Sequence, residues 1–87
     1  LLLAAARRLP EGEALSRRGG FRGWAPDLLL GRELRGQRAV LLGRGRIGRE
    51  TARLYRAVGL RIEWITRADN DAAIDRKLTR ADVLSLH

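Results

Sequence analysis

Residues 38–60 read RAVLLGRGRIGRETARLYRAVGL, and this stretch decides the fold. It opens with a short apolar run, Ala39–Leu42, which is typical of a parallel strand buried on both faces. A G-x-G-x-x-G pattern follows without a gap at residues 43–48, and residues 47–58 repeat apolar side chains at helical spacing. The stretch therefore predicts a strand, a glycine turn and a helix in immediate succession.

Patterns on the C-terminal side extend this unit. Leu60–Thr66 alternates apolar and polar residues, which predicts a second strand. Asn70 or Asp71 can cap a short helix, and Asp82–Leu86 is a candidate third strand. The alternation predicts an α/β fold, a partial Rossmann fold that is the β-α-β-α-β half of a doubly wound parallel sheet. We expect the first strand to pair with a fourth strand outside the 87 residues, which would leave an open sheet edge.

The N-terminal third has no such regular pattern. Leu1–Leu9 reads as the end of a helix, because leucine and alanine favour helices and Pro10 follows. Glycines then interrupt Glu11–Gly23, which predicts a loop. We therefore divide the chain into residues 1–36, a helix end and a long loop or arm, and residues 37–87, the first half of a dinucleotide-binding domain.

Composition limits the function classes. The 87 residues contain no cysteine and one histidine, which excludes a disulfide framework and a zinc site built from such residues. No apolar run approaches the length of a membrane span, so we expect a cytoplasmic protein that does not contact a membrane. Because the chain has no methionine and both of its ends are apolar, we also expect it to be a piece of a longer polypeptide.

The charge raises a second possibility. Eighteen basic residues against ten acidic ones give a net charge of +8, which is a footprint expected of nucleic-acid-binding proteins. The arginines, however, are spread along the whole chain, and no run of basic residues exceeds two. A basic arm would be blocky. Nucleic-acid binding is therefore the less favoured alternative.

The glycine pattern predicts a dinucleotide site. Gly43 would allow a tight turn, and Gly48 would let the helix pack closely on the strand. Gly45 would let a pyrophosphate approach the backbone at the helix N-terminus, where unpaired N–H groups and the helix dipole favour an anion. A glycine turn that binds no ligand is the alternative.

The stretch from Trp24 to Gly59 resembles the D-isomer-specific 2-hydroxyacid dehydrogenases, a family that includes glyoxylate/hydroxypyruvate reductases and phosphoglycerate dehydrogenases. The resemblance rests on GRELRG at residues 31–36, LLGRGRIG at residues 41–48 and ADVLSLH at residues 81–87. It implies an oxidoreductase that transfers a hydride between NAD(P) and a small D-2-hydroxy acid or 2-keto acid. A dinucleotide-regulated binding protein on the same fold, similar to a corepressor, is the alternative that it leaves open.

The resemblance also implies roles for particular residues. It assigns contacts with the diphosphate to Arg46 and Ile47, and it places Leu86 and His87 at the strand end that lines the cofactor cleft. With the glycine loop and its arginine, the predicted cofactor-binding residues here are Gly43, Arg44, Gly45, Arg46, Ile47, Gly48, Leu86 and His87. It places no catalytic residue in this chain, because the family's catalytic Arg, Glu and His lie beyond His87. Leu1–Leu9 and the segment around Trp24 would contribute to a homodimer.

Thr66 bears on the choice of cofactor. In the family's spacing it falls where NAD-preferring enzymes place an acidic residue against the ribose 2′-hydroxyl. A hydroxyl donor followed by the guanidinium of Arg67 can instead bind a 2′-phosphate, and Arg44 adds positive charge. We therefore predict NADP as the preferred cofactor. The alternative is that Asp69 or Glu63 serves the ribose, although Asp69 comes three residues late and Glu63 lies in mid-strand.

Overall fold

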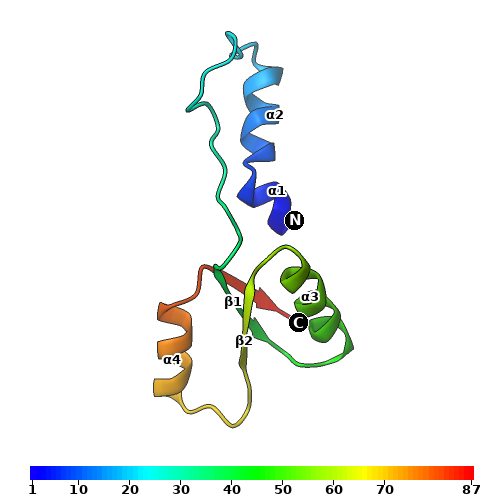
Figure 1. Ribbon diagram of the computed structural model, residues 1–87, viewed down its shortest axis with the longest axis vertical. Helices are drawn as coiled ribbons and strands as arrows, with labels where there is room; N and C mark the ends of the chain where they lie inside the picture. Colours follow the sequence, from blue (N-terminus) through cyan, green and yellow to red (C-terminus); the bar gives the residue numbers. More distant parts are fainter. The chain divides into compact units, whose positions relative to one another are not determined.

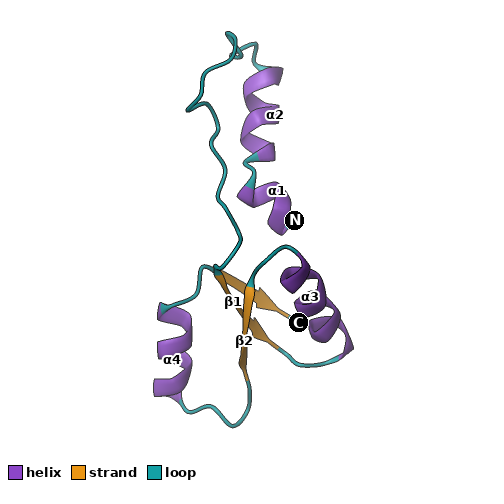
Figure 2. Ribbon diagram, in the orientation of Figure 1, coloured by secondary structure: helices purple, strands orange, loops and turns teal.

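The computed structural model describes residues 1–87, which divide into two compact units, Leu1–Glu33 and Leu34–His87. The first unit contains α1 (Leu2–Ala6) and α2 (Leu9–Arg17). The second unit contains, in chain order (Figures 1 and 2), β1 (Arg38–Leu42), α3 (Arg46–Ala57), β2 (Arg61–Ile65), α4 (Asp71–Thr79) and β3 (Val83–Leu86). The three strands and α3 lie within one residue of their predicted bounds.

The second unit is an α/β fold with a parallel sheet of order β2-β1-β3. The connection from β1 to β2 runs to one side of β1, and the connection from β2 to β3 runs back past it. Because such crossovers are right-handed, the two connecting helices must cover opposite faces of the sheet. Figure 1 shows this arrangement, with α3 on one side of the strands and α4 on the other. The predicted partial Rossmann fold is confirmed.

The position of β1 in the sheet differs from our expectation. Leu41 pairs with Trp64 of β2 on one side and with Ser85 of β3 on the other. The expectation that β1 needs a fourth strand from outside the chain is therefore wrong. The reason is the return crossover through α4, which brings the third strand next to the first rather than next to the second.

The core of the second unit is centred on β1. Ala39, Val40 and Leu41 have no exposed surface, and neither has Ala52 of α3. This burial confirms that the apolar run of the sequence is a strand covered on both faces. Leu42, the next residue, is 44% exposed, so the core ends where the chain enters the glycine loop.

The segment before β1 packs with the sheet. Leu34 is buried, and the Gly36 N–H donates a hydrogen bond of 2.8 Å to the Gly59 carbonyl, just before β2. The contacts therefore divide the chain after Glu33, whereas the sequence pattern placed the boundary after Gly36.

The N-terminal helices correct the sequence interpretation. Pro10 does not end a helix but lies in the first turn of α2, where its missing N–H costs nothing. The break comes earlier, at Arg8, whose φ of 56° is left-handed. The predicted loop from Glu11 is helical as far as Arg17, and the Arg17–Glu13 ion pair at 2.8 Å supports that turn. None of the helices combines the length and the apolar composition that a transmembrane span needs.

Candidate dinucleotide-binding site

The carboxyl ends of the three parallel strands meet at one edge of the sheet. The connection from β1 leads to β2 on one side of it, and the next connection returns to β3 on its other side. The point between the carboxyl ends of β1 and β3 is therefore a topological switch point, where ligands bind in such sheets. Two pockets open at this edge. One, of about 260 Å³, is lined by Gly45–Gly48 and His87. The other, of about 290 Å³, is lined by Leu42–Arg44 and Ile65–Arg67.

The three glycines of the loop differ in what requires them. Gly43 has a φ of +99°, and a Cβ there would overlap the carbonyl oxygen of His87. A Cβ at Gly48 would overlap the Gly43 carbonyl oxygen and lie 3.4 Å from the ring of Trp64. Gly45 has an ordinary φ of −72°, and a Cβ there would meet nothing within 4 Å. The fold therefore requires the first and third glycines, while the second leaves open space of the kind a bound diphosphate needs.

The N-terminus of α3 has unsatisfied donors. Gly45 is the N-cap and offers no side chain, and the first helical bond runs from the Arg49 N–H to the Gly45 carbonyl at 3.0 Å. The N–H groups of Arg46, Ile47 and Gly48 therefore lack an acceptor within the helix. Together with the positive end of the helix dipole, they form an arrangement that can bind an anion. The residues that the sequence assigned to the diphosphate lie together at this point.

The residue that follows β3 lines the first pocket. The His87 N–H donates to the Leu42 carbonyl at 2.9 Å, which holds the chain against the end of β1. The His87 Nε2 lies 2.8 Å from the Ser85 hydroxyl, and His87 itself lines the pocket. Leu86, the other predicted residue of this strand, pairs with Leu42 and is exposed but lines neither pocket.

Three residues give the second pocket its chemistry. Arg44 and Arg67 bring positive charge from the ends of β1 and β2, and Thr66 lies beside Arg67. The Arg44 guanidinium lies over the ring of Trp64, 5.8 Å from its centroid, which is within the range of a cation–π interaction. The three residues that the sequence linked to the ribose are thus brought together in one pocket.

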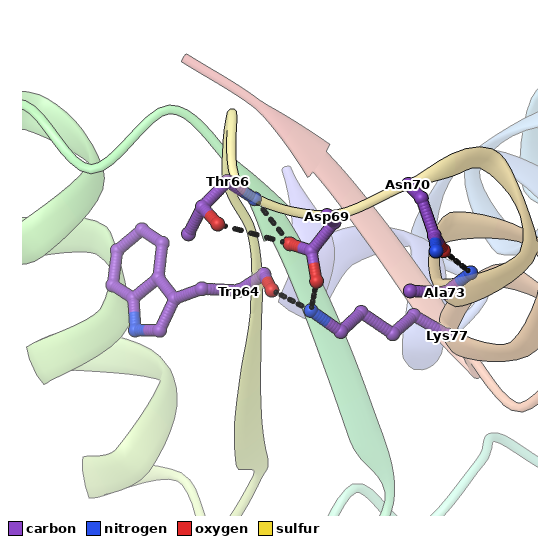
Figure 3. Close-up of polar contacts among 6 residues, drawn as sticks. All are labelled: Trp64, Thr66, Asp69, Asn70, Ala73 and Lys77. Carbon is purple, nitrogen blue, oxygen red and sulfur yellow. Dashed lines mark hydrogen bonds and ion pairs between the residues drawn. The ribbon is translucent and has the colours of Figure 1, made fainter.

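Asp69 also reaches this end of β2, although it comes three residues late in the sequence. Figure 3 shows its carboxylate against Thr66: Oδ2 accepts hydrogen bonds from the Thr66 N–H at 2.7 Å and from the Thr66 hydroxyl at 3.0 Å. The Lys77 ammonium donates to Asp69 Oδ1 and to the Trp64 carbonyl. The hydrogen bond from Lys77, followed by that from the Thr66 N–H, lowers the pKa of Asp69 to about 2.

The contacts of Asp69 with Thr66 and Lys77 were not predicted from the sequence. The Asp69 N–H donates to the Thr66 carbonyl at 3.1 Å, so residues 66–69 form a turn that folds the carboxylate back onto the strand end. The signal was an aspartate three residues after a threonine, since Asp side chains commonly bind backbone groups in turns. Glu63, the other candidate for the ribose, lies 3.9 Å from the guanidinium of Arg38 instead.

Comparison with known proteins identifies the family of the chain. The family model described as "D-isomer specific 2-hydroxyacid dehydrogenase, NAD binding domain" matches residues 1–87. The chain is 36% identical over 101 aligned residues to the glyoxylate reductase of Aeropyrum pernix, an alignment that covers 100% of this chain and 30% of the relative. These matches support neither of the two alternatives, a dinucleotide-regulated protein similar to a corepressor and a nucleic-acid-binding protein.

Solved structures agree with this match. The TT0316 protein of Thermus thermophilus is 41% identical with a TM-score of 0.88, covering 99% of this chain and 29% of that one. A D-lactate dehydrogenase of Aquifex aeolicus, in complex with NAD and lactic acid, is 25% identical with a TM-score of 0.80, covering 99% and 28%. The chain thus spans less than a third of these relatives. It belongs to the D-isomer-specific 2-hydroxyacid dehydrogenase family, within the NAD-binding domain.

Proposed function

We propose that these residues bind the cofactor in an NAD(P)-dependent dehydrogenase or reductase that acts on a small D-2-hydroxy acid or 2-keto acid when complete. The observation that carries the proposal is Gly45. Neither its backbone angles nor its packing requires a glycine, and yet the position lies at the open N-terminus of α3. Space for a diphosphate beside free amides accounts for both features.

Each part of the site then has a task. The amides of Arg46, Ile47 and Gly48 would hold the diphosphate, and the Arg46 guanidinium adds positive charge in the first turn. His87 would border the cofactor from the end of β3. The bound nicotinamide would supply or accept the hydride, while the protein supplies orientation and electrostatics. Binding of the keto acid and transfer of the proton would fall to residues outside this chain, as the family resemblance implies.

The proposal includes a preference for NADP. Thr66 is not acidic, and Arg44 and Arg67 flank the second pocket, where the adenosine ribose would lie. Two guanidinium groups favour a 2′-phosphate over a 2′-hydroxyl through charge-assisted hydrogen bonds. Calorimetric titration of the complete protein with both cofactors tests this point. NADP should bind more tightly, and tighter binding of NAD would overturn the preference while leaving the dinucleotide site in place.

A glycine-to-alanine pair tests the site itself. In the complete protein, Gly45→Ala should weaken dinucleotide binding by about tenfold or more, because the added methyl fills the space next to the free amides. Gly12→Ala is the matched control, since a Cβ at Gly12 meets only the flexible end of Leu29, at 3.3 Å. It should leave binding unchanged. Equal dinucleotide binding by the wild type and Gly45→Ala would contradict the proposed function. So would the absence of turnover by the wild type across a panel of small 2-keto acids that includes glyoxylate and hydroxypyruvate.

We also propose that the complete protein is a homodimer that uses Leu1–Leu9 and the segment around Trp24. Large apolar side chains in the first unit support this. Leu1, Leu3 and Leu9 are exposed, and Trp24 is 84% exposed, which is unusual for so large an apolar residue. Analytical ultracentrifugation should find a dimer, and Trp24→Arg should shift it toward monomer. A wild-type protein that stays monomeric at micromolar concentration would overturn this part of the proposal.

A further inference from the structure

Three hydrogen-bond donors surround one carboxylate just after β2. The Thr66 N–H and hydroxyl both donate to Asp69 Oδ2, and the Lys77 ammonium donates to Oδ1 from the neighbouring helix α4 (Figure 3). The side chains of Asp69 and Lys77 are 15% and 21% exposed, so the ion pair between them is partly shielded from solvent. The Asp69 carboxylate is therefore an anion bound by donors of its own chain at the end of β2.

These donors are the ones that a ribose 2′-phosphate would use. A backbone N–H and a hydroxyl each carry a single proton, so neither group can donate a full hydrogen bond to Asp69 and to a phosphate at once. A phosphate oxygen bound to the Thr66 hydroxyl would also lie no more than about 6 Å from Asp69 Oδ2. Two anions at that separation repel each other, and each disfavours the charged form of the other.

A ribose 2′-hydroxyl faces no such conflict. It carries its own proton and can donate it to a carboxylate, which has about four acceptor sites on its two oxygens. In the structure Asp69 accepts three hydrogen bonds, two from Thr66 and one from Lys77, so one acceptor site remains. Apart from the charges of Arg44 and Arg67, the contacts of Asp69 with Thr66 and Lys77 therefore favour an unphosphorylated ribose over a phosphorylated one.

We propose that Asp69 is a specificity-determining residue whose carboxylate occupies the Thr66 donors and thereby lowers affinity for 2′-phosphorylated adenine nucleotides relative to unphosphorylated ones. It acts against Arg44 and Arg67, and the balance between these charges sets the choice between NADP and NAD. Lys77 limits the effect by neutralising the carboxylate. The inference rests on the proposed dinucleotide site.

The test measures binding of ADP-ribose and 2′-phospho-ADP-ribose to the complete protein by calorimetry, which needs no turnover. Asp69→Asn removes the charge but keeps a carbonyl oxygen for the Thr66 N–H, so the turn retains an acceptor. The ratio of the two dissociation constants should shift about tenfold toward the phosphorylated ligand. Asp75→Asn, which removes an exposed charge from the same helix α4, is the control and should shift the ratio less than about twofold, because solvent and salt screen it.

A second variant gives the opposite sign. Lys77→Met leaves Asp69 without its ammonium partner, so the ratio should shift about tenfold toward ADP-ribose. A merely structural role for the cluster would weaken both ligands together and leave the ratio unchanged. An unchanged ratio in both variants, or equal shifts in Asp69→Asn and Asp75→Asn, overturns the inference alone. Failure of the wild type to bind either ligand at millimolar concentration overturns the proposed function as well.

Discussion

The N-termini of α3 and α4 differ in one respect although their backbones are nearly alike. Gly45 caps α3 with φ −72° and ψ −168°, and Asn70 caps α4 with φ −80° and ψ 168°. The Asn70 side chain accepts a hydrogen bond of 2.9 Å from the Ala73 N–H, whereas α3 has no side-chain cap at all. A side chain therefore satisfies one N–H group at the start of α4, whereas no side chain does so at the start of α3. We call the start of α4 closed and the start of α3 open.

This difference shows that folding does not require a glycine at position 45. Asn70 demonstrates that a residue with a side chain adopts this backbone conformation and stabilises the helix start. A glycine cap gives up that stabilisation, which is worth a few tenths of a kcal/mol relative to asparagine. We therefore expect the open start of α3 to serve a ligand, and the variants below test that expectation by exchanging features between the two helices.

The largest effect is expected from Gly45→Asn, which gives α3 the cap of α4. The asparagine side chain should accept a hydrogen bond from the free N–H groups and occupy the space beside them. The dinucleotide affinity of the complete protein should therefore fall at least a hundredfold, equivalent to about 3 kcal/mol. The free energy of unfolding should stay equal or rise by a few tenths of a kcal/mol. Calorimetry and urea unfolding measure the two quantities. If the variant binds dinucleotide as tightly as the wild type, the open helix start does not serve a ligand.

The next effect is expected at Gly48, which the fold itself requires. Alanine normally stabilises a helix interior by about 1 kcal/mol over glycine, but here its Cβ would overlap the Gly43 carbonyl. Gly48→Ala should therefore lower the free energy of unfolding by about 3 kcal/mol, as overpacking does. Gly12→Ala in α2 is the control and should not destabilise, because only the end of Leu29 lies near its Cβ. Urea unfolding of both variants decides the point, and equal effects would contradict it.

The same loop shows how far sequence reasoning reaches. The apolar run Ala39–Leu42 and the spacing of the glycines are local patterns, and both the strand and the turn follow from them. The place of β3 beside β1 does not, because strand order depends on the direction of a crossover that no local pattern encodes. At the N-terminus, the prediction that Pro10 ends a helix is wrong for a similar reason. A proline is compatible both with the end of one helix and with the first turn of the next, and the local sequence does not distinguish the two.

Within the site the limit lies in turn chemistry. Arg44, Thr66 and Arg67 were placed by spacing along the chain, which works because they follow directly from strand ends. Asp69 returns to Thr66 only through the turn at residues 66–69, and Lys77 joins it from α4. Contacts of this kind depend on tertiary packing, so counting residues along the chain could not place Asp69 against Thr66 or Lys77.

A smaller effect is expected from opening the closed helix start. Asn70→Ala removes the only side-chain acceptor at the start of α4 and should lower the free energy of unfolding by about 1 kcal/mol. Dinucleotide affinity should not change, because Asn70 lines neither pocket at the sheet edge. Urea unfolding and calorimetry measure the two effects. A loss of affinity comparable to that of Gly45→Asn would remove the distinction between the two helix starts.

The last effect concerns pH. In the folded protein the pKa of Asp69 is lowered from its ordinary value of 3.8 to about 2, chiefly by the hydrogen bond from Lys77. A lowered pKa stabilises the folded state above the unfolded pKa, and this stabilisation is lost as pH falls from about 4 to about 2. Thermal unfolding should therefore show Asp69→Asn less stable than the wild type above about pH 5, with the gap narrowing below about pH 4. The gap caused by Asn70→Ala should keep its size over the same range, because an amide does not ionise; a gap for Asp69→Asn that also stays constant would show that the carboxylate charge adds nothing to the turn.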